Sequence, residues 1–209
     1  MRSFLRDNGL SLVMVGLFGL CLIGHAISGY HVDAEERTDH GAPPVTFAEY
    51  LLTAHFGESL FENWESEFLQ MASYVVLTAK LYQRGSAESR PLPDEEHSED
   101  EEPFPDEVAA QYSWLYQHSL SLSLGVLFLG SFVLHAVTGW QQHNVNAARH
   151  GVSSSTFFEF CGSAEFWFQS FQNWQSEYLS VAALIILSIF LRERGSPESK
   201  SLTAAHWKT

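Results

Sequence analysis

Leu10–Gly29 reads LSLVMVGLFGLCLIGHAISG, 20 consecutive residues without Asp, Glu, Lys or Arg. A second uncharged stretch of the same length, Leu120–Gly139, reads LSLSLGVLFLGSFVLHAVTG. About 20 helical residues at a rise of about 1.5 Å cover the roughly 30 Å hydrocarbon layer of a bilayer. The two stretches therefore predict membrane-spanning helices. A cleaved signal peptide is the alternative for the first stretch, since Arg2 and Arg6 precede it, but the second lies in mid-chain.

The two apolar stretches belong to a tandem repeat. Sliding the sequence by 110 residues superposes residues 4–92 on residues 114–202 without a gap and places His25 on His135. Such self-similarity indicates a duplicated structural unit. The sequence predicts three parts: a first two-span repeat (1–90), an acidic, proline-containing cytoplasmic linker (91–112), and a second two-span repeat with a short C-terminal tail (113–209).

Each repeat contains a second, shorter apolar stretch. Phe68–Ala79 and Tyr178–Leu191 reach spanning length when they are extended backward by about one turn to Trp64 and Trp174. Both repeats then insert the same way up, so the repeat is parallel. The predicted fold is an all-α membrane protein with four transmembrane helices, built from two units of helix, interfacial helix and helix.

The segment between the two spans of each repeat begins with a helix signal. Thr46 and Glu49 form a capping-box pattern, which Thr156 and Glu159 repeat. Apolar residues then follow at helical spacing. We expect short amphipathic helices on the outer membrane face over residues 46–60 and 156–170, with a re-entrant loop as the alternative.

The distribution of cations sets the orientation in the membrane. Only Arg37 and Arg149 fall on the side of the interfacial segments. The other nine fall on the opposite side: Arg2, Arg6, Lys80, Arg84, Arg90, Arg192, Arg194, Lys200 and Lys208. Because cytoplasmic loops carry the excess of Lys and Arg, we expect a multi-pass protein of the plasma membrane with both termini in the cytoplasm.

The ionisable residues inside the predicted spans include His25, Glu67, His135 and Glu177. His25 is 15 residues from Leu10, or about 22 Å, and Glu67 is 14 residues from Leu81, or about 21 Å. The four groups are thus expected in one layer near the outer face. A His–Glu pair in lipid can hold or pass a proton, so the pattern predicts a proton or cation site formed twice.

Other polar and aromatic residues surround this layer. Supporting hydrogen bonds are expected from residues on the second spans: Asn63, Ser66, Asn173 and Ser176. Aromatic side chains at the membrane boundary are expected to act as interface anchors: Trp64, Trp174, Tyr30 and Trp140. The competing interpretation is that the polar residues only join helices or reach toward the interface. A metal bound by two His and two Glu, or a haem bound by the histidines, stays a further alternative.

Composition excludes several classes of function. The formal net charge is −14, and the 11 Lys and Arg are too few and too scattered for a nucleic-acid partner. Nine of the 25 acids lie in the run from Asp94 to Glu107, which predicts a solvated linker. No nucleophile–base spacing, phosphate loop or metal-finger pattern is present, so an enzyme is not favoured and no cofactor is expected.

The motifs also resemble a known family. They are F-L-x-x-N-G-L-S near the start, F-E-N-W-E-S-E-F-L-Q at Phe61–Gln70 and R-G-S-x-E-S at Arg84–Ser89. The second copy has F-Q-N-W-Q-S-E-Y-L at Phe171–Leu179 and R-G-S-P-E-S at Arg194–Ser199. This combination resembles an uncharacterised family of small prokaryotic integral membrane proteins, one of the numbered domain-of-unknown-function families. The resemblance implies a membrane location and a repeated two-span unit, without an activity.

The sequence thus leads to a functional hypothesis with one main rival. The hypothesis is proton or small-cation handling at a pseudo-two-fold His/Glu site near the outer membrane face. The rival is a non-catalytic scaffold or accessory subunit whose polar residues fix helix packing. Besides the lipid bilayer, a second copy of the chain or a membrane partner protein is the expected partner, because four helices enclose little space.

Overall fold

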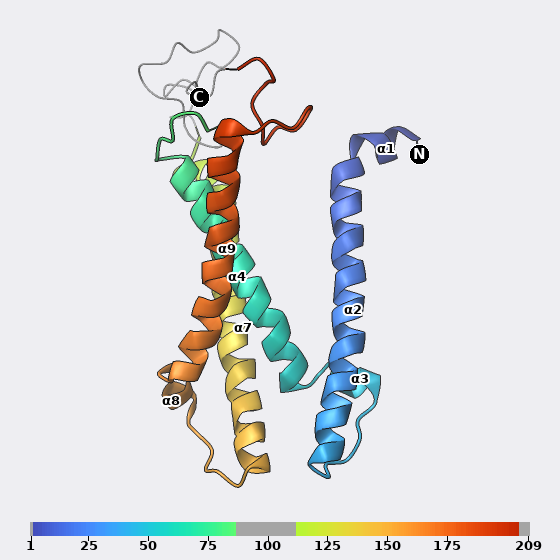
Figure 1. Ribbon diagram of the computed structural model, residues 1–209. Coiled ribbons are helices and arrows are strands. Elements are labelled where there is room, and N and C mark those ends of the chain that lie inside the picture. The colour runs from blue at the N-terminus through green and yellow to red at the C-terminus, as the bar shows by residue number, and fades with distance from the viewer. Residues whose placement is uncertain (1, 87–111, 205–209) are drawn as a thin grey trace. The chain divides into compact units, whose positions relative to one another are not determined.

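A computed structural model describes residues 2–86 and 112–204, so all but the last residue of the predicted linker (91–112) lies outside the described residues. These residues form helices and no strands, which confirms the all-helical class. The helices are α1 (Arg2–Asp7), α2 (Gly9–Asp39), α3 (Phe47–Tyr50), α4 (Ala54–Thr78), α6 (Trp114–Gln117), α7 (Ser119–Arg149), α8 (Phe157–Cys161) and α9 (Ala164–Phe190) (Figure 1).

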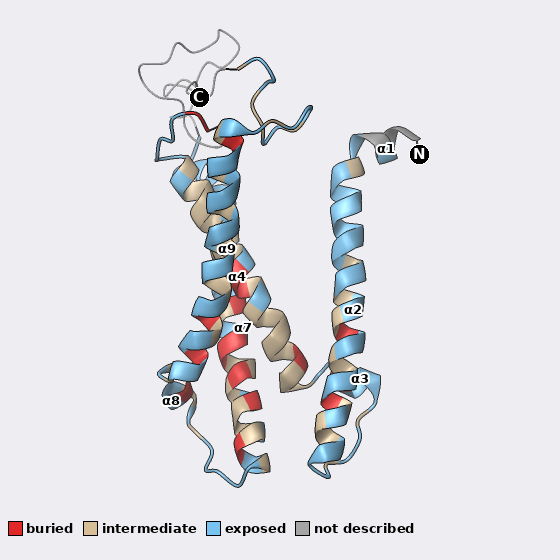
Figure 2. Ribbon diagram, in the orientation of Figure 1, coloured by how far each residue is buried: buried red, intermediate tan, exposed pale blue. Residues whose placement is uncertain are grey.

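Within the described ranges, α2 and α7 are the two helices that are long and apolar enough to cross a membrane. Each has 31 residues and so continues past the predicted 20-residue stretch. The reason is local: residues 30–39 and 140–149 contain neither Gly nor Pro and include good helix formers. Exposed side chains cover most of α2 (Figure 2).

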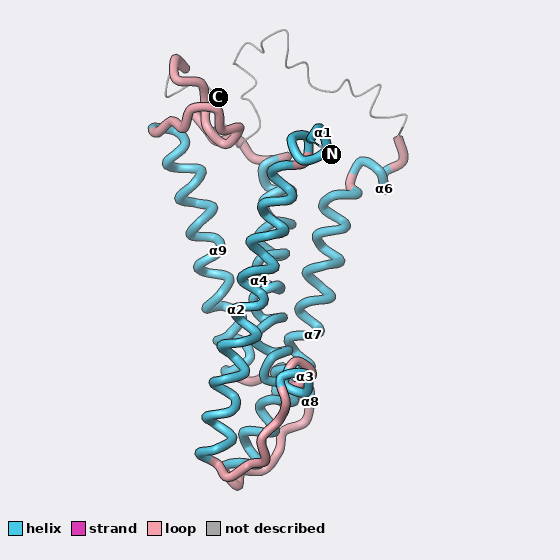
Figure 3. Tube along the Cα trace, turned by 90° about the vertical axis from the view of Figure 1, so that its right-hand side faces the viewer, coloured by secondary structure: helices cyan, strands magenta, loops and turns pink. Residues whose placement is uncertain are grey.

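Glycine ends both long helices in the same way. Gly41 and Gly151 have φ angles of 62° and 68°, a left-handed conformation that favours glycine. After α2, the Ala42 amide donates to the Arg37 carbonyl at 2.8 Å. After α7, the Val152 amide donates to the Ala147 carbonyl at 2.8 Å. This is the Schellman motif, and it turns the chain into the loops that precede α3 and α8 (Figure 3).

The predicted capping boxes are confirmed, but the helices that they start are shorter than expected. The Glu49 amide donates to Thr46 Oγ1, and the Thr46 amide donates to Glu49 Oε2 at 2.7 Å. Thr156 and Glu159 repeat both bonds. A short helix follows each capping box, but neither fills its segment 46–60 or 156–170, because α4 and α9 begin within those segments. The interfacial position of the short helices stays a prediction.

A second cap explains these early starts. The Ser163 hydroxyl accepts from the Phe166 amide at the beginning of α9. The Thr53 hydroxyl accepts from the Phe56 amide at 3.3 Å at the beginning of α4. Each segment thus contains two helix caps within eight residues. The first cap starts a short helix, α3 or α8, and the second starts a long one, α4 or α9.

The described chain divides into two compact units. Unit 1 contains Met1–Leu60 and Leu134–Cys161, and unit 2 contains Phe61–Val133 and Gly162–Thr209. Each unit takes residues from both halves of the sequence. Helices α4 and α7 contribute to both units. The predicted repeat boundaries, which describe the sequence, stay a prediction.

The core of unit 1 forms around Tyr50, which is completely buried and packs with Phe56 and Ala26. The absence of a side chain at Gly29 lets the Tyr50 hydroxyl approach α2, since a Cβ there would overlap it. Burial, and then the carboxylate of Asp33, raise the pKa of Tyr50. This contact fixes the angle between α2 and the turn that follows it.

We expect Gly29→Ala to destabilise the protein by about 1–3 kcal/mol, the usual cost of forcing an extra methyl group into a packed site. Thermal unfolding followed by helical circular dichroism in detergent measures the effect. Gly24→Ala on the same helix is the matched control, because nothing lies within 4 Å of a Cβ there. Equal melting temperatures for the two variants would contradict the proposed contact.

The capping boxes predict a pH dependence. Hydrogen bonds from Thr46, first from its amide and then from its hydroxyl, lower the pKa of Glu49, and Thr156 acts likewise on Glu159. A lowered pKa in the folded state means that the caps stabilise above the unfolded-state pKa and that this stability is lost as pH falls through the folded-state value.

Between pH 5 and pH 3, the melting temperature of the parent should therefore fall more than that of a Thr46→Ala/Thr156→Ala variant. The variant has already lost the hydroxyl part of each cap. Parallel pH profiles for the two proteins would show that the caps do not contribute to stability.

Candidate functional site

The first predicted histidine, His25, lies on α2 in unit 1. Its Nε2 atom is 3.0 Å from Ser59 Oγ, and its ring packs on Phe56 with the centroids 5.4 Å apart. The Ser59 hydroxyl donates to the Phe56 carbonyl at 3.1 Å. We therefore assign the proton of this tautomer to Nε2, which leaves Nδ1 as the nitrogen that accepts a proton.

The second histidine, His135, lies on α7 and also belongs to unit 1. Its side chain is completely buried, whereas His25 is half-buried. Corresponding positions of the two halves thus have different environments. Glu67 and Glu177 belong to unit 2, so the predicted pairing of each histidine with a glutamate stays a prediction.

Glu67 and Glu177 lie on α4 and α9 within unit 2. Glu67 is exposed and Glu177 is half-buried. The two acids that the sequence placed at equivalent positions thus lie on the two helices that contact each other in this unit.

Within residues 2–86 and 112–204, the most buried carboxyl group is not among the predicted site residues. Glu65 on α4 is completely buried, and its Oε1 accepts a hydrogen bond from Trp174 Nε1 at 2.8 Å. One turn earlier, Glu62 Oε1 accepts from Asn173 Nδ2. These two bonds join α4 to α9 between residues more than 100 positions apart in the sequence.

A signal for these two acids was present in the sequence. Glu62 and Glu65 align with Gln172 and Gln175 of the second copy, so the two copies differ where the first has acids. Glu67 and Glu177, by contrast, are identical in the two copies. The acids of the helix contact lie instead at positions where the copies differ.

The residues expected to support the site mainly bind their own helices. The Ser66 hydroxyl donates to the Asn63 carbonyl at 2.8 Å, and Ser176 donates to Asn173 in the same way. Asn63 itself is exposed. Asn173 also reaches the other helix, because its Nδ2 donates to Glu62 Oε1 on α4.

The predicted interface anchors hold loops in place. The Tyr30 hydroxyl donates to the Val45 carbonyl at 3.2 Å, and Trp140 Nε1 donates to the Ser155 carbonyl at 2.8 Å. Both bonds fasten the loop that follows a long helix. Trp64 packs edge-on against Phe61. Their position at a membrane boundary stays a prediction.

One buried hydroxyl lies close to the Glu62 and Glu65 contacts. Ser170 on α9 is 1% exposed, and its Oγ has no hydrogen-bond partner among the described residues. It precedes Asn173 by three residues and Trp174 by four, so the three side chains share one helix face. The face of α9 that binds the two glutamates therefore also carries an unused oxygen ligand.

Metal ligands do not gather elsewhere in the described part of the chain. No group of three or more His, Cys, Asp or Glu residues there has the arrangement of a metal site. His40 and His150 follow α2 and α7, and their rings meet edge to face with the centroids 5.5 Å apart. Beside them, Arg149 forms an ion pair with Glu36 at 2.9 Å.

Comparison with known proteins gives one result. No curated protein and no solved structure matches the chain. A family model does match, and it covers residues 1–209. The chain belongs to the family described as a domain of unknown function, DUF6766.

Proposed function

We propose that this protein is a plasma-membrane protein with four spans that binds and passes protons or small cations at the carboxylates between α4 and α9. The observation that carries the proposal is the completely buried carboxyl group of Glu65 on a helix that contains neither Lys nor Arg.

The apolar surface of the long helices supports insertion into a membrane. In the most apolar window of α2, 6% of the residues are buried, and in that of α7 17% are buried. The core helix of a water-soluble protein buries most of such a window. Outward-facing apolar side chains of this kind need lipid around them.

Helices α4 and α9 are the proposed second and fourth spans. With 25 and 27 residues they measure about 37–40 Å, enough for the hydrocarbon layer. Their polar residues lie mainly in the amino-terminal halves. The last turns of α9 expose apolar side chains, among them Ile186 and Phe190 at 56% and 60%.

Recurring local features support the parallel repeat. Helices α2 and α7 have equal lengths, and their first residues are 110 positions apart (119 − 9). Capping boxes precede α3 and α8, and left-handed glycines recur as Gly41 with Gly151 and Gly85 with Gly195. Together with the excess of cations on one side, the repeat favours cytoplasmic termini.

The charge balance of α4 and α9 favours protons or cations as cargo. Glu58, Glu62, Glu65 and Glu67 lie on α4, and Glu165 and Glu177 lie on α9, but neither helix contains Lys or Arg. A pair of helices that is rich in acids attracts positive charge. Protons or small cations are therefore the favoured cargo, and Ser170 and Asn173 offer neutral oxygen ligands on the same face of α9.

A scaffold is the second candidate, because a specific observation favours it. Four side-chain bonds join α4 to α9: Glu62–Asn173, Glu65–Trp174, Gln70–Ser180 and Ser73–Tyr178. Interhelical hydrogen bonds of this kind stabilise membrane helix pairs by about 0.6 kcal/mol each on average. In this alternative the carboxylates only hold the helices in register.

The topology predicts which sites react with an impermeant maleimide in intact cells, after Cys21 and Cys161 are replaced by Ser. Four spans place Ser153→Cys outside and Gln83→Cys inside. If α2 and α7 were the only spans, Gln83→Cys would be outside and Ser153→Cys inside. Ala42→Cys is outside in both cases and serves as the control. Labelling of Gln83→Cys without labelling of Ser153→Cys would overturn the four-span proposal.

Purified protein in liposomes tests cation handling. With an imposed membrane potential and a pH-sensitive dye inside, the parent should acidify or alkalinise the lumen faster than protein-free liposomes do. Glu65→Gln removes the charge but keeps an oxygen acceptor for Trp174 Nε1, so it should fold and lower the flux at least about tenfold, the effect of losing about 1.4 kcal/mol in the rate-limiting step.

Two further variants and one ion series complete the flux test. Glu165→Gln, at an exposed acid in the first turn of α9, is the matched control and should conduct like the parent. Glu67→Gln/Glu177→Gln removes the two acids that recur in both copies and should also lower the flux. Repeating the assay with Na⁺ and K⁺ gradients covers small cations. A parent protein that moves none of these ions leaves the scaffold as the remaining function.

A further inference from the structure

The chain after α9 forms a loop whose two ends are joined by Arg192. Its Nη1 atom donates to the carbonyls of Ser188 and Ile189, in the last turn of α9, at 3.1 Å each. Its Nη2 atom donates to the Ala204 carbonyl at 3.2 Å. Residues 193–203, the C-terminal loop, therefore form a compact loop with adjacent ends, a type of loop that often carries function.

Hydrogen bonds within the C-terminal loop hold its shape. The Glu193 amide donates to the Ser199 hydroxyl at 2.8 Å, and the Glu198 amide donates to the Ser196 hydroxyl at 3.2 Å. Near the beginning of the loop, Gly195 has a φ angle of 85°, a left-handed conformation that favours glycine. A loop that is fixed before a ligand arrives loses less conformational entropy when it binds one.

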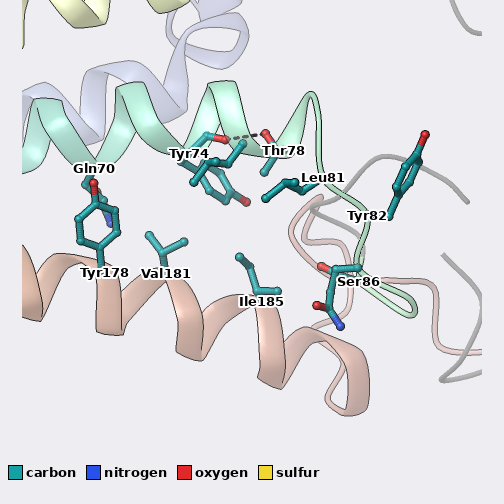
Figure 4. Close-up of a pocket in the computed structure, with 11 residues that line it drawn as sticks. Gln70, Tyr74, Thr78, Leu81, Tyr82, Ser86, Tyr178, Val181 and Ile185 are labelled. Carbon is teal, nitrogen blue, oxygen red and sulfur yellow. Dashed lines mark hydrogen bonds between the residues drawn. The ribbon is translucent and has the colours of Figure 1, made fainter.

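The turn that begins this loop recurs after α4, but with different surroundings. Gly85 has a φ angle of 84°. The Ser86 amide donates to the Gln83 carbonyl at 3.0 Å, and the Ser196 amide donates to the Glu193 carbonyl at 3.3 Å. Ser86 is completely buried and lines a groove between α4 and α9 (Figure 4), whereas Ser196 is half-buried. Helix packing thus accounts for the first turn but not for the second.

The C-terminal loop surrounds an open hollow of about 560 Å³, which is in the usual size range of small-ligand sites. All residues that line this hollow belong to the loop. Arg194 and Lys200 are the cations of the lining, and Glu193 is an acid. Positive charge therefore exceeds negative charge here, although the chain as a whole has a formal net charge of −14. The hollow favours an anion.

The end of α9 does not oppose an anion at this place. The last carbonyls of a helix carry a partial negative charge, which repels anions. Arg192 compensates this charge by donating to carbonyls of the last turn, and it is not one of the residues that line the hollow. The guanidinium of Arg194, the ammonium of Lys200 and the hydroxyl groups of Ser201 and Thr203 are donors of the kinds that bind phosphate oxygens.

We propose that the C-terminal loop binds a phosphate group between Arg194 and Lys200, with Ser201 and Thr203 as additional donors. The phosphate belongs to a soluble phosphate compound or to the headgroup of an anionic phospholipid, because the chemistry of recognition is the same for both. This inference depends neither on cation transport nor on the number of spans. A negative result in the flux or labelling experiments above therefore leaves it standing, and its own failure leaves those proposals standing.

Isothermal titration calorimetry of the full chain in a neutral detergent, with inorganic phosphate at constant ionic strength, tests the inference. The parent should bind phosphate saturably. Arg194→Gln and Lys200→Gln should each weaken binding at least about tenfold, the effect of losing a hydrogen bond to a charged group. Lys80→Gln, at an exposed cation after α4, changes the net charge equally and should bind like the parent. Circular dichroism verifies that each variant keeps its helices.

A second titration, with short-chain phosphatidylglycerol, distinguishes the two sources of the phosphate. Binding of phosphatidylglycerol at least about tenfold tighter than that of inorganic phosphate, weakened by Arg194→Gln and Lys200→Gln, would assign the site to a lipid headgroup. Phosphatidylglycerol that binds no tighter than inorganic phosphate would assign the site to a soluble phosphate compound. Both results support a phosphate site in the loop.

Three results would overturn the inference. The first is a parent protein that binds neither inorganic phosphate nor phosphatidylglycerol. The second is binding that persists unchanged in Arg194→Gln and Lys200→Gln, which would place the anion elsewhere. The third is an equal loss of binding in Lys80→Gln, which would indicate a general effect of net charge instead of a site.

Discussion

The packing of α4 against α9 buries a carboxyl group between two helices that contain neither Lys nor Arg. Glu65 is completely buried, and its Oε1 accepts a hydrogen bond from the indole of Trp174. The Glu62–Asn173 bond lies one turn earlier on the same side of α4. The proposed cation handling would act at this same contact, so it would depend on the packing that buries Glu65.

The two copies of the motif divide this contact between them. The first copy provides the acceptors Glu62 and Glu65, and the second provides the donors Asn173 and Trp174. In the second copy, Gln172 and Gln175 replace Glu62 and Glu65. A contact in which the second copy provided the acceptors and the first copy the donors would therefore contain no carboxylate. The similarity of the two halves therefore supports parallel insertion, while their differences permit one buried acidic contact instead of two.

Much of the local structure could be predicted from the sequence, because short-range patterns determine it. The capping boxes at Thr46 and Thr156 and the left-handed turns at Gly41 and Gly151 depend on a few neighbouring residues. The choice between Glu65 and Glu67 could not be predicted. Residues separated by two positions in a helix differ in direction by about 200° around the helix axis. Glu65 and Glu67 therefore lie on nearly opposite faces of α4, and only the packing of α9 decides which one is buried.

The charges along α4 and α9 satisfy more than one physical requirement. Acids lie toward the amino ends of both helices, and cations follow the carboxyl ends at Lys80 and Arg192. Because the helix dipole favours this distribution, it would stabilise the helices even in water. The same cations are part of the excess of Lys and Arg on which the proposed topology rests. One distribution of charge thus agrees both with two stable helices and with cytoplasmic ends for them, so the charge pattern alone does not distinguish a membrane helix pair from a water-exposed one.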